Sequence, residues 1–406
     1  MQSTVVIVGG GPAGSFAAYE LAKRGVDVSV FEEHSQIGVP SHCAGHLSIK
    51  SLKNLGLYPL PKGVLENEFS GVNFYSSNGT KFAVCLSKPV TCAVNRELFD
   101  KYLAEKAQAA GAKYFFGSHV SSLIVEDDYV KGIHVINRER LKVPVEAKVV
   151  IDAEGISARL LRQVGLSPFS RDSLVYAVEA EVENVRNVEE NAVEVYMGSN
   201  YAPGFYAWLI PRLDGTAKLG LAVKKGSPKD FLERLLRKHP VASNQLRDAK
   251  FLRVNFHAIP IGGLIKKAYG NGFLAVGDCA SQVKPTTGGG VIFGVSCARI
   301  AAEVASQALK IGDVSATSLK LYMKRVQGAF GFDSQIMLRL RNFFNTLSDE
   351  QLDNVLRFAT KTGFASALRN IEEIDFQGHT LINVFMKPSA YATLVYLAYL
   401  YMSANA

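Results

Sequence analysis

The stretch TVVIVGGGPAGSFAAYELAKRGVDVSVFEE, residues 4–33, decides the fold class of this chain. The β-branched run Thr4–Val8 predicts a strand that is buried on both faces. A glycine turn follows, and apolar side chains then recur at near-helical spacing until about Arg24. Val26–Phe31 predicts a second strand, which ends at two glutamates. The stretch is therefore a βαβ unit, typical of a dinucleotide-binding domain.

The turn between the first strand and the helix has the spacing G-x-G-x-x-G. Its first glycine permits a tight turn, its second lets the backbone approach a pyrophosphate, and its third lets the helix pack closely on the strand. The free N–H groups and partial positive charge of the helix N-terminus favour the same anion. The expected contacts to the dinucleotide in this loop are Gly9, Gly11, Pro12, Ala13 and Gly14.

A ligand for the ribose is expected at the end of the second strand. Glu32 stands there, roughly 20 residues beyond the glycine loop, as such acids do. Glu33 is the neighbouring candidate, which the alternation of side chains along a strand disfavours. The glycine fingerprint occurs once, whereas an enzyme that holds FAD and NAD(P) in separate Rossmann halves usually shows two. The single copy favours one tightly held dinucleotide, FAD rather than NAD.

A second signature lies at residues 273–294, FLAVGDCASQVKPTTGGGVIFG. Asp278 follows a predicted strand, where a carboxylate can bind a ribityl hydroxyl of a flavin. Three glycines, Gly288–Gly290, allow the backbone to approach a flat ring because no side chain intervenes. The helix predicted to start at about Val291 can stabilise negative charge on a reduced flavin.

These motifs resemble those of the glutathione-reductase-like flavoproteins of the p-hydroxybenzoate-hydroxylase group, and within that group the geranylgeranyl reductase family. The resemblance extends along the whole chain. It implies non-covalent FAD and saturation of isoprenoid C=C bonds, on ether-linked membrane lipids or on the geranylgeranyl tail of chlorophyll precursors. The further segments that carry it are PSHCAG (40–45), VNRELFD (94–100), YAWLIP (206–211) and TTGGG (286–290).

The resemblance assigns roles to single residues. Arg96 is expected to contact the pyrophosphate or adenosine side of FAD; a surface arginine paired with Glu97 or Asp100 is the other interpretation. Cys43 is expected near the isoalloxazine, as a proton donor, a ring contact or part of the substrate channel; a small packed hydrophobe is the alternative. The remaining cofactor contacts expected from the resemblance are Ala44, Gly45, Val120 and Val291.

Tyr206 and Trp208 alternate with smaller residues and so share one face of a predicted strand. They form either an aromatic wall beside the flavin, shaping a slot for an isoprenoid chain, or ordinary packing of a sheet on another layer. With Cys43 they are the candidate catalytic residues. His42 and His46 flank Cys43, but a fourth ligand is missing and no metal site is expected.

Three functions from different classes follow. The first is an FAD-dependent reductase of geranylgeranyl lipids, whose reduced electron donor is NAD(P)H or a ferredoxin. The second is a flavin monooxygenase or halogenase acting on a small aromatic; Glu154, where the hydroxylases carry Asp-Gly, disfavours the NADPH site that this function needs. The third is a non-catalytic FAD-dependent lipid-binding protein.

Composition and charge limit the binding partners and the cellular location that we expect. The net charge is +8, but Lys and Arg are scattered, so nucleic acid is not an expected partner. Five cysteines with no CxxC pair, and no signal-like start, indicate the cytoplasm. The tail 381–406 is apolar with one charge, Lys387, and its helix from about Ser389 to Ser403 is too short to span the roughly 30 Å core of a bilayer. We expect it to dock on the protein, cap the substrate tunnel or rest peripherally on the membrane.

The expected fold class is α/β: a Rossmann-like FAD-binding domain interleaved with an antiparallel-sheet substrate domain, plus a C-terminal helical region. The expected bounds are 1–73, 95–170 and 256–316 for the FAD-binding domain, 74–94 and 171–255 for the substrate domain, and 317–406 for the helical region.

Overall fold

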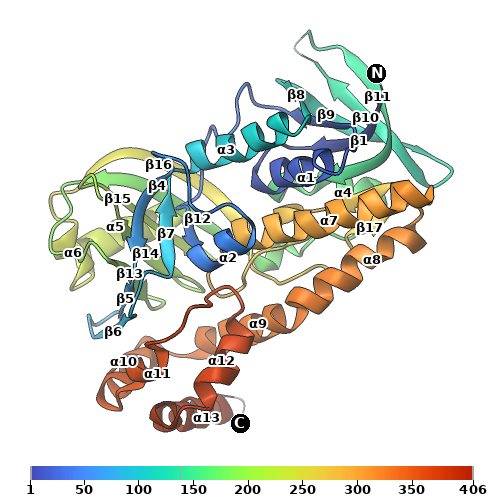
Figure 1. Cartoon of the computed structure of the whole chain (residues 1–406). Helices are drawn as coiled ribbons and strands as arrows, with labels where there is room; N and C mark the ends of the chain where they lie inside the picture. The colour runs from blue at the N-terminus through green and yellow to red at the C-terminus, as the bar shows by residue number, and fades with distance from the viewer. Residues whose placement is uncertain (1, 138, 405–406) are drawn as a thin grey trace. The chain divides into compact units, whose positions relative to one another are not determined.

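The computed structural model describes residues 2–137 and 139–404 (Figure 1). Contacts divide the chain into two compact units. Unit 1 consists of Met1–Ser41, Arg96–Ser173 and Pro260–Ser334. Unit 2 consists of His42–Asn95, Leu174–Ile259 and Gln335–Ala406.

Unit 1 is built on a mostly parallel sheet in the order β17-β18-β11-β1-β2-β8, to which β10 and β9 add antiparallel strands. Val8 at the end of β1 lies opposite Phe31 and Asp152 of its neighbours, so these parallel strands end at one edge of the sheet. That edge is where a doubly wound fold binds its ligand. The strands are β1 (Gln2–Val8), β2 (Val28–Glu32), β8 (Lys113–Phe116), β9 (His119–Glu126), β10 (Tyr129–Ile136), β11 (Lys142–Asp152), β17 (Tyr269–Gly270) and β18 (Phe273–Ala275).

Helices cover this sheet. In unit 1, α1 packs against α3 and α7, and α7 packs against α8. Among the described helices, α7 has the length and apolar composition of a membrane span, but 67% of its most apolar window is buried, as in a core helix. The helices are α1 (Pro12–Ala22), α3 (Arg96–Ala109), α4 (Arg159–Gln163), α7 (Val291–Ile311) and α8 (Ala316–Val326).

The sequence pattern predicts two short strands at Lys142–Ala147 and Val149–Asp152, and that prediction is wrong. The structure has one strand, β11, over both. Its first half pairs antiparallel with β10 and its second half pairs parallel with β1, with Glu146 taking part in both ladders. Two successive partners sustain one long strand where the local pattern indicates a break.

Unit 2 contains a seven-stranded sheet, β16-β12-β15-β14-β13-β5-β6, and a three-stranded sheet, β3-β7-β4. The larger sheet is mostly antiparallel, as the alternating pattern predicts. Its strands are β5 (Gly71–Tyr75), β6 (Lys81–Cys85), β12 (Leu174–Glu183), β13 (Ala192–Met197), β14 (Tyr206–Pro211), β15 (Ala217–Val223) and β16 (Lys250–Pro260). The smaller sheet has β3 (His46–Ser48), β4 (Leu65–Phe69) and β7 (Thr91–Val94).

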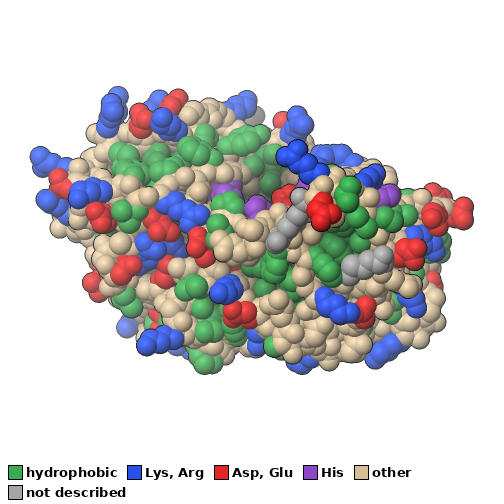
Figure 2. Space-filling view, turned by 90° about the horizontal axis from the view of Figure 1, so that it is seen from above, with side chains coloured by type: hydrophobic (Ala, Val, Ile, Leu, Met, Phe, Trp, Pro, Cys, Tyr) green, Lys and Arg blue, Asp and Glu red, His purple; other side chains and the backbone are tan. Residues whose placement is uncertain are grey.

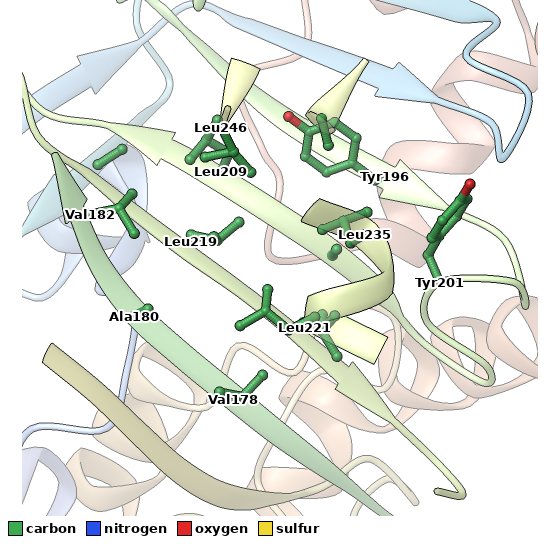
Figure 3. Packing of buried hydrophobic residues seen from close by; sticks show 14 of the residues in the cluster. Val178, Ala180, Val182, Tyr196, Tyr201, Leu209, Leu219, Leu221, Leu235 and Leu246 are labelled. Atoms are coloured by element: carbon green, nitrogen blue, oxygen red, sulfur yellow. The ribbon is translucent and has the colours of Figure 1, made fainter. Parts of the chain in front are cut away.

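One face of the larger sheet holds a buried core against α5 (Pro228–Lys238) and α6 (Ala242–Gln245). Figure 3 shows its side chains, and alternate residues of each strand contribute to it. On β15, for example, Leu219 and Leu221 face this core, so Lys218 and Gly220 face the other side. The labelled core residues are Val178, Ala180, Val182, Tyr196, Tyr201, Leu209, Leu219, Leu221, Leu235 and Leu246.

The C-terminal part of unit 2 is helical, as the sequence predicts. The last helix lies at Tyr391–Ala404 after a 3₁₀ turn at Pro388–Ala390, close to the expected range. Leu400 of this helix is buried in a cluster with Phe343, Leu352 and other apolar residues. The helices are α9 (Phe332–Thr346), α10 (Asp349–Lys361), α11 (Phe364–Leu368), α12 (Gln377–Phe385) and α13 (Tyr391–Ala404), and α2 (Ile49–Asn54) lies earlier in the unit.

The compact units and the expected domain bounds differ in several places. Residues 42–73 belong to unit 2, because β3 and β4 pair with β7, and β5 pairs with β13. Residues 335–406 also group with this unit. The division of labour between a flavin domain and a substrate domain remains a proposal.

Charge is distributed over the surface without a dominant patch on the face shown in Figure 2. Lys and Arg side chains alternate there with Asp and Glu, and hydrophobic side chains are visible between them.

Candidate functional site

The glycine loop of unit 1 uses its three glycines for three different reasons. Gly9 has a φ of +95°, and a Cβ there would lie 2.5 Å from the Ala153 oxygen. A Cβ at Gly14 would overlap the Gly9 oxygen. At Gly11, by contrast, no atom of the described residues beyond its two chain neighbours lies within 4 Å of the position that a Cβ would take. The first and third glycines are therefore needed by the fold itself, whereas the second leaves open space in front of α1.

The acid at the end of β2 lies against this loop. Oε2 of Glu32 accepts a hydrogen bond from the Gly10 N–H (2.7 Å), and Oε1 accepts one from the His34 N–H (2.9 Å). Glu33 points elsewhere, with Oε2 2.9 Å from Nδ1 of His119. Of the two expected ribose ligands, the structure places Glu32 beside the glycine loop.

The second signature lies close to the first, although roughly 260 residues separate them in the sequence. A Cβ at Gly294 of α7 would lie 3.2 Å from the Gly277 Cα and 3.5 Å from the Ala13 Cβ. Helices α1 and α7 approach this closely because the small residues remove the side chains between them. The loop of residues 277–290 is thereby brought to the N-terminus of α1.

Asp278 is held beside the triple-glycine turn. A Cβ at Gly290 would lie 2.9 Å from Oδ1 of Asp278, so only glycine fits there without a shift. Burial raises the pKa of Asp278 to about 6, and the positive charge of Arg96 opposes the rise. Arg96 itself starts α3 and donates from Nε and Nη2 to Asp100 (3.0 and 2.9 Å). The pairing with Asp100 is thus present, and Arg96 also acts electrostatically on the candidate flavin ligand Asp278.

The remaining expected cofactor residues of unit 1 are placed as follows. Val120 is buried in β9, and Val291 is the first residue of α7. Gly288 has a φ of +69°, which favours glycine. A Cβ at Gly289 would lie 2.7 Å from Cε of Lys284.

These residues fit FAD. The N-cap residue of α1 is Gly11, which has no side chain to cap the first N–H groups, and the space at its Cβ position is open among the described residues, as a pyrophosphate requires. An acid lies at the strand end for a ribose, and a second acid lies beside a glycine turn for the ribityl chain. The geometry in unit 1 therefore supports the expected dinucleotide site, while the contacts of each residue to FAD remain a proposal.

In unit 2, Cys43 lies in a loop without helix or strand and is half-buried, with a free thiol. The Gly45 N–H donates to Sγ of Cys43 at 3.5 Å. The next carbonyl, that of Ala44, accepts a hydrogen bond from Nζ of Lys218 (3.1 Å). The loop is thus held by backbone and side-chain contacts within its own unit.

Tyr206 and Trp208 lie on β14 with their rings edge to face, 5.9 Å apart. A Cβ at Gly220, opposite Trp208 on β15, would overlap the indole, so the missing side chain makes room for that ring. Phe205 stacks on Tyr206 at 4.4 Å. Burial raises the pKa of Tyr206 to about 12, so its hydroxyl stays protonated at neutral pH. The two rings therefore form a rigid aromatic wall.

The histidines beside Cys43 have ordinary partners. Nε2 of His46 lies 2.7 Å from Oγ1 of Thr91, and His42 stacks on His257 with ring centres 6.4 Å apart. No group of three or more potential metal ligands occurs among residues 2–137 and 139–404.

Glu154 has a structural function in this chain. Its Oε1 accepts a hydrogen bond from the Leu160 N–H (2.7 Å) at the start of α4, and Oε2 lies 3.3 Å from Nε of Arg159. Burial and the neighbouring Glu154 raise the pKa of Asp152 well above its usual range.

Three residues of unit 2 that support the candidate site were not predicted from the sequence. Gly220 makes room for Trp208, Lys218 holds the Cys43 loop, and Arg341 of α9 lies with its guanidinium 4.2 Å from the ring centre of Phe205. The one available signal was a lysine within the apolar run AKLGLAV at residues 217–223. Nothing in the local sequence relates Arg341 to the aromatic residues.

Comparison with known proteins agrees with this geometry. A family model described as an FAD binding domain matches residues 2–302. Digeranylgeranylglycerophospholipid reductase 2 of Methanopyrus kandleri is 34% identical over 87% of this chain and 89% of its own length. The crystal structure of a geranylgeranyl bacteriochlorophyll reductase-like protein from Thermoplasma acidophilum has a TM-score of 0.87 and 26% identity, covering 98% of this chain and 99% of its own.

A flavin-dependent brominase shares the fold alone, with a TM-score of 0.73 at 20% identity, over 98% of this chain and 99% of its own. The FAD binding domain and the relatives that are named as reductases define an FAD-dependent oxidoreductase. Within that class, the chain belongs to the digeranylgeranylglycerophospholipid reductase family.

The raised pKa of Asp278 predicts a pH-dependent stability of the flavin-free protein. Because the folded state holds this proton more tightly than the unfolded state, stability should fall as pH rises from about 4 to about 6. Asp278→Asn removes that loss. At pH 7.5 we expect the variant apoprotein to be more stable by up to about 3 kcal/mol, and at pH 4 we expect no difference. Urea unfolding of both apoproteins at the two pH values measures this, and an equal difference at both would contradict it.

Proposed function

We propose that this protein saturates C=C bonds of geranylgeranyl chains carried by ether-linked membrane lipid precursors. The observation that carries the proposal is the meeting of two flavin motifs at one edge of the unit 1 sheet, in a chain of the digeranylgeranylglycerophospholipid reductase family. The relatives supply the substrate class, and the motifs supply the chemistry.

Bound FAD, once reduced, supplies the hydride for one alkene carbon. The protein must hold FAD and deliver a proton to the other carbon. Gly11, Glu32, Arg96 and Asp278 are the proposed holders of FAD. The thiol of Cys43 is the proposed proton donor, and the Tyr206 hydroxyl, which stays protonated at neutral pH, is the second candidate.

An isoprenoid chain gives a protein few hydrogen bonds to make, so shape and apolar area must bind it. The Tyr206–Trp208 wall is the proposed surface for this chain. Its position is secured by Gly220, over which the indole lies, and by the stacking of Phe205 on Tyr206.

Halogenases and monooxygenases remain the second candidate because they share the fold. A shared fold at 20% identity does not indicate the substrate. The relatives that are named as reductases, by contrast, are more than 30% identical to this chain. A non-catalytic lipid-binding protein would hold FAD without turnover.

One experiment separates these functions. The purified yellow protein is reduced anaerobically with dithionite, which replaces both NAD(P)H and a ferredoxin, and a geranylgeranyl ether lipid is added. We expect reoxidation of the flavin and a mass gain of the lipid in steps of two hydrogens. Reoxidation that needs oxygen and an aromatic substrate would favour the halogenase or monooxygenase. A flavin that stays reduced would favour the carrier.

The C-terminal helix supports a peripheral contact with the membrane. One face of α13 docks through Leu400, while Tyr391, Val395 and Tyr399 are at least half exposed and recur every four residues along the other face. Apolar and tyrosine side chains in such a stripe suit the boundary between water and lipid. The net charge of +8 favours an anionic surface. We propose that this stripe, defined by Tyr391, Val395 and Tyr399, rests on the bilayer that holds the substrate.

Substitution of the stripe should detach the protein from vesicles. The double variant Val395→Glu/Tyr399→Glu leaves Leu400 in its buried cluster, and we expect its partitioning to anionic phospholipid vesicles to fall by about tenfold or more. Co-sedimentation measures it. Tyr176→Glu, at a tyrosine of β12 that is 45% exposed, is the control and should sediment like the unaltered protein. Unchanged sedimentation of the double variant would assign the stripe no part in membrane binding.

A further inference from the structure

Lys218 is a buried cation in a strand that is otherwise apolar. Its residue is 3% exposed, and its Nζ donates hydrogen bonds to the carbonyls of Ala44 (3.1 Å) and Val94 (2.8 Å). Nζ also lies 2.6 Å from Oε2 of Glu66, an ion pair rather than a well-aligned hydrogen bond. Burying an ammonium costs free energy unless such partners surround it. The presence of this lysine in an apolar strand therefore suggests that its contacts have a function.

The two carbonyls show what the lysine holds. Ala44 directly follows Cys43, and residues 41–45 form neither helix nor strand. The next carbonyl, that of Gly45, accepts a hydrogen bond from the Val94 N–H (2.9 Å). Successive carbonyls after Cys43 are therefore tied to Lys218 and to β7. These contacts fix the backbone that carries the thiol.

The same lysine belongs to the sheet that bears the aromatic wall. Lys218 lies directly opposite Ile210 of β14, and Ile210 shares a face with Tyr206 and Trp208 because side chains alternate along the strand. Two residues along β15, Gly220 lies opposite Trp208. One strand thus makes room for the indole and reaches the loop of the thiol.

Glu66 balances the charge of the lysine and connects it to Arg212. Nη1 of Arg212 lies 3.2 Å from Oε1 of Glu66, Nη2 lies 3.3 Å from Oε2 of Glu181, and Nε donates to Oγ1 of Thr216 (2.6 Å). None of these partners belongs to the Cys43 loop. Arg212 is therefore a second cation that pairs with Glu66. Unlike Lys218, it has no hydrogen bond or ion pair to the Cys43 loop among those given above.

We infer that Lys218 is a positioning residue, which sets the place of the Cys43 thiol relative to the Tyr206–Trp208 wall. The inference rests on the proposed function, because the thiol matters for catalysis only if it serves the reduction. Lys218 touches neither flavin nor lipid in this role and acts through the backbone of the loop.

The test compares Lys218→Met with Arg212→Met in the FAD-loaded protein. Alkylation of Cys43 by iodoacetamide is followed by mass spectrometry, with the exposed Cys85 of the same molecule as the reference. In Lys218→Met we expect Cys43 to react about fivefold faster relative to Cys85, because the loop has lost a hydrogen bond and opens more often. In Arg212→Met the alkylation rate of Cys43 relative to Cys85 should stay within about twofold of that in the unaltered protein. The reason is that Arg212 bonds to Glu66, Glu181 and Thr216 and to no residue of the Cys43 loop.

Single-turnover reduction of a geranylgeranyl ether lipid gives the second measurement. We expect Lys218→Met to lower the rate of the chemical step about 100-fold at saturating lipid, with a smaller change in the lipid concentration needed for half saturation. If Lys218 had only a structural role, the variant would give less folded, flavin-loaded protein, but the rate of the chemical step in that protein would be unchanged. If Lys218→Met does not fold, Lys218→Met/Glu66→Gln removes both charges and is used in its place.

The outcomes are distinct. An unchanged alkylation ratio of Cys43 in the lysine variant overturns the positioning role, as does an equal increase in Arg212→Met. If the unaltered protein reduces no prenyl lipid, the proposed function fails, whereas the alkylation ratio still decides whether Lys218 holds the loop.

Discussion

We expect Gly11→Val to yield a folded protein that binds FAD about 10- to 100-fold more weakly. The added side chain occupies the space that a pyrophosphate must enter. The structure explains why the fold survives. Gly11 has a φ of −66° in the extended region, and its new Cβ would have no described atom within 4 Å apart from those of its chain neighbours. Flavin absorbance after desalting measures the loss, and the far-ultraviolet circular dichroism should match that of the unaltered apoprotein.

The neighbouring glycine provides the contrast for this experiment. Gly14→Val would place its Cβ onto the Gly9 oxygen, so we expect it to damage the fold itself and not FAD binding alone. A yellow Gly11→Val protein with one FAD per chain would overturn the assignment of the loop to the dinucleotide.

Cys43→Ser lowers the single-turnover rate of alkene reduction by about 100-fold while FAD remains bound. General acid catalysis contributes roughly this factor, and a hydroxyl is a much weaker acid than a thiol. FAD should be retained, because Cys43 is not among the proposed holders of FAD, and serine is close to cysteine in size. Stopped-flow reoxidation of the dithionite-reduced flavin by a geranylgeranyl lipid measures the rate.

Cys85→Ser is the matched control, since it makes the same change at an exposed cysteine of β6. It should reduce the lipid at the rate of the unaltered protein. An unchanged rate in Cys43→Ser would assign Cys43 to packing and leave the Tyr206 hydroxyl as the candidate proton donor.

The proposed FAD residues of unit 1 could be predicted from the sequence because their signals are local. A glycine loop, a strand before it and a helix after it are neighbours in the chain, and each glycine is required by a backbone conformation or a close approach. The same reasoning found Asp278 and the triple-glycine turn. Strand alternation also favoured Glu32 over Glu33, and the structure places Glu32 beside Gly10.

The proposed substrate residues of unit 2 depend on contacts that no local pattern encodes. Cys43, Tyr206 and Trp208 were proposed from a resemblance, but their supports were not. Lys218 reaches the carbonyl of Ala44, which lies 174 residues earlier in the chain. Arg341 reaches Phe205 from a helix more than a hundred residues later. Such pairings follow from strand order and helix packing, which a single sequence does not display.

The sequence by itself determined the fold class, the dinucleotide loop and the family, because backbone conformation and close approach impose residue types at fixed spacing. Tertiary structure alone decided that β11 is one strand, that residues 42–73 pair with unit 2, and that a lysine in an apolar strand holds a loop. The physical reason is that these features are settled by hydrogen bonds and packing between segments distant in the chain. A buried ammonium, in particular, is stable only where the fold brings carbonyls and a carboxylate to it.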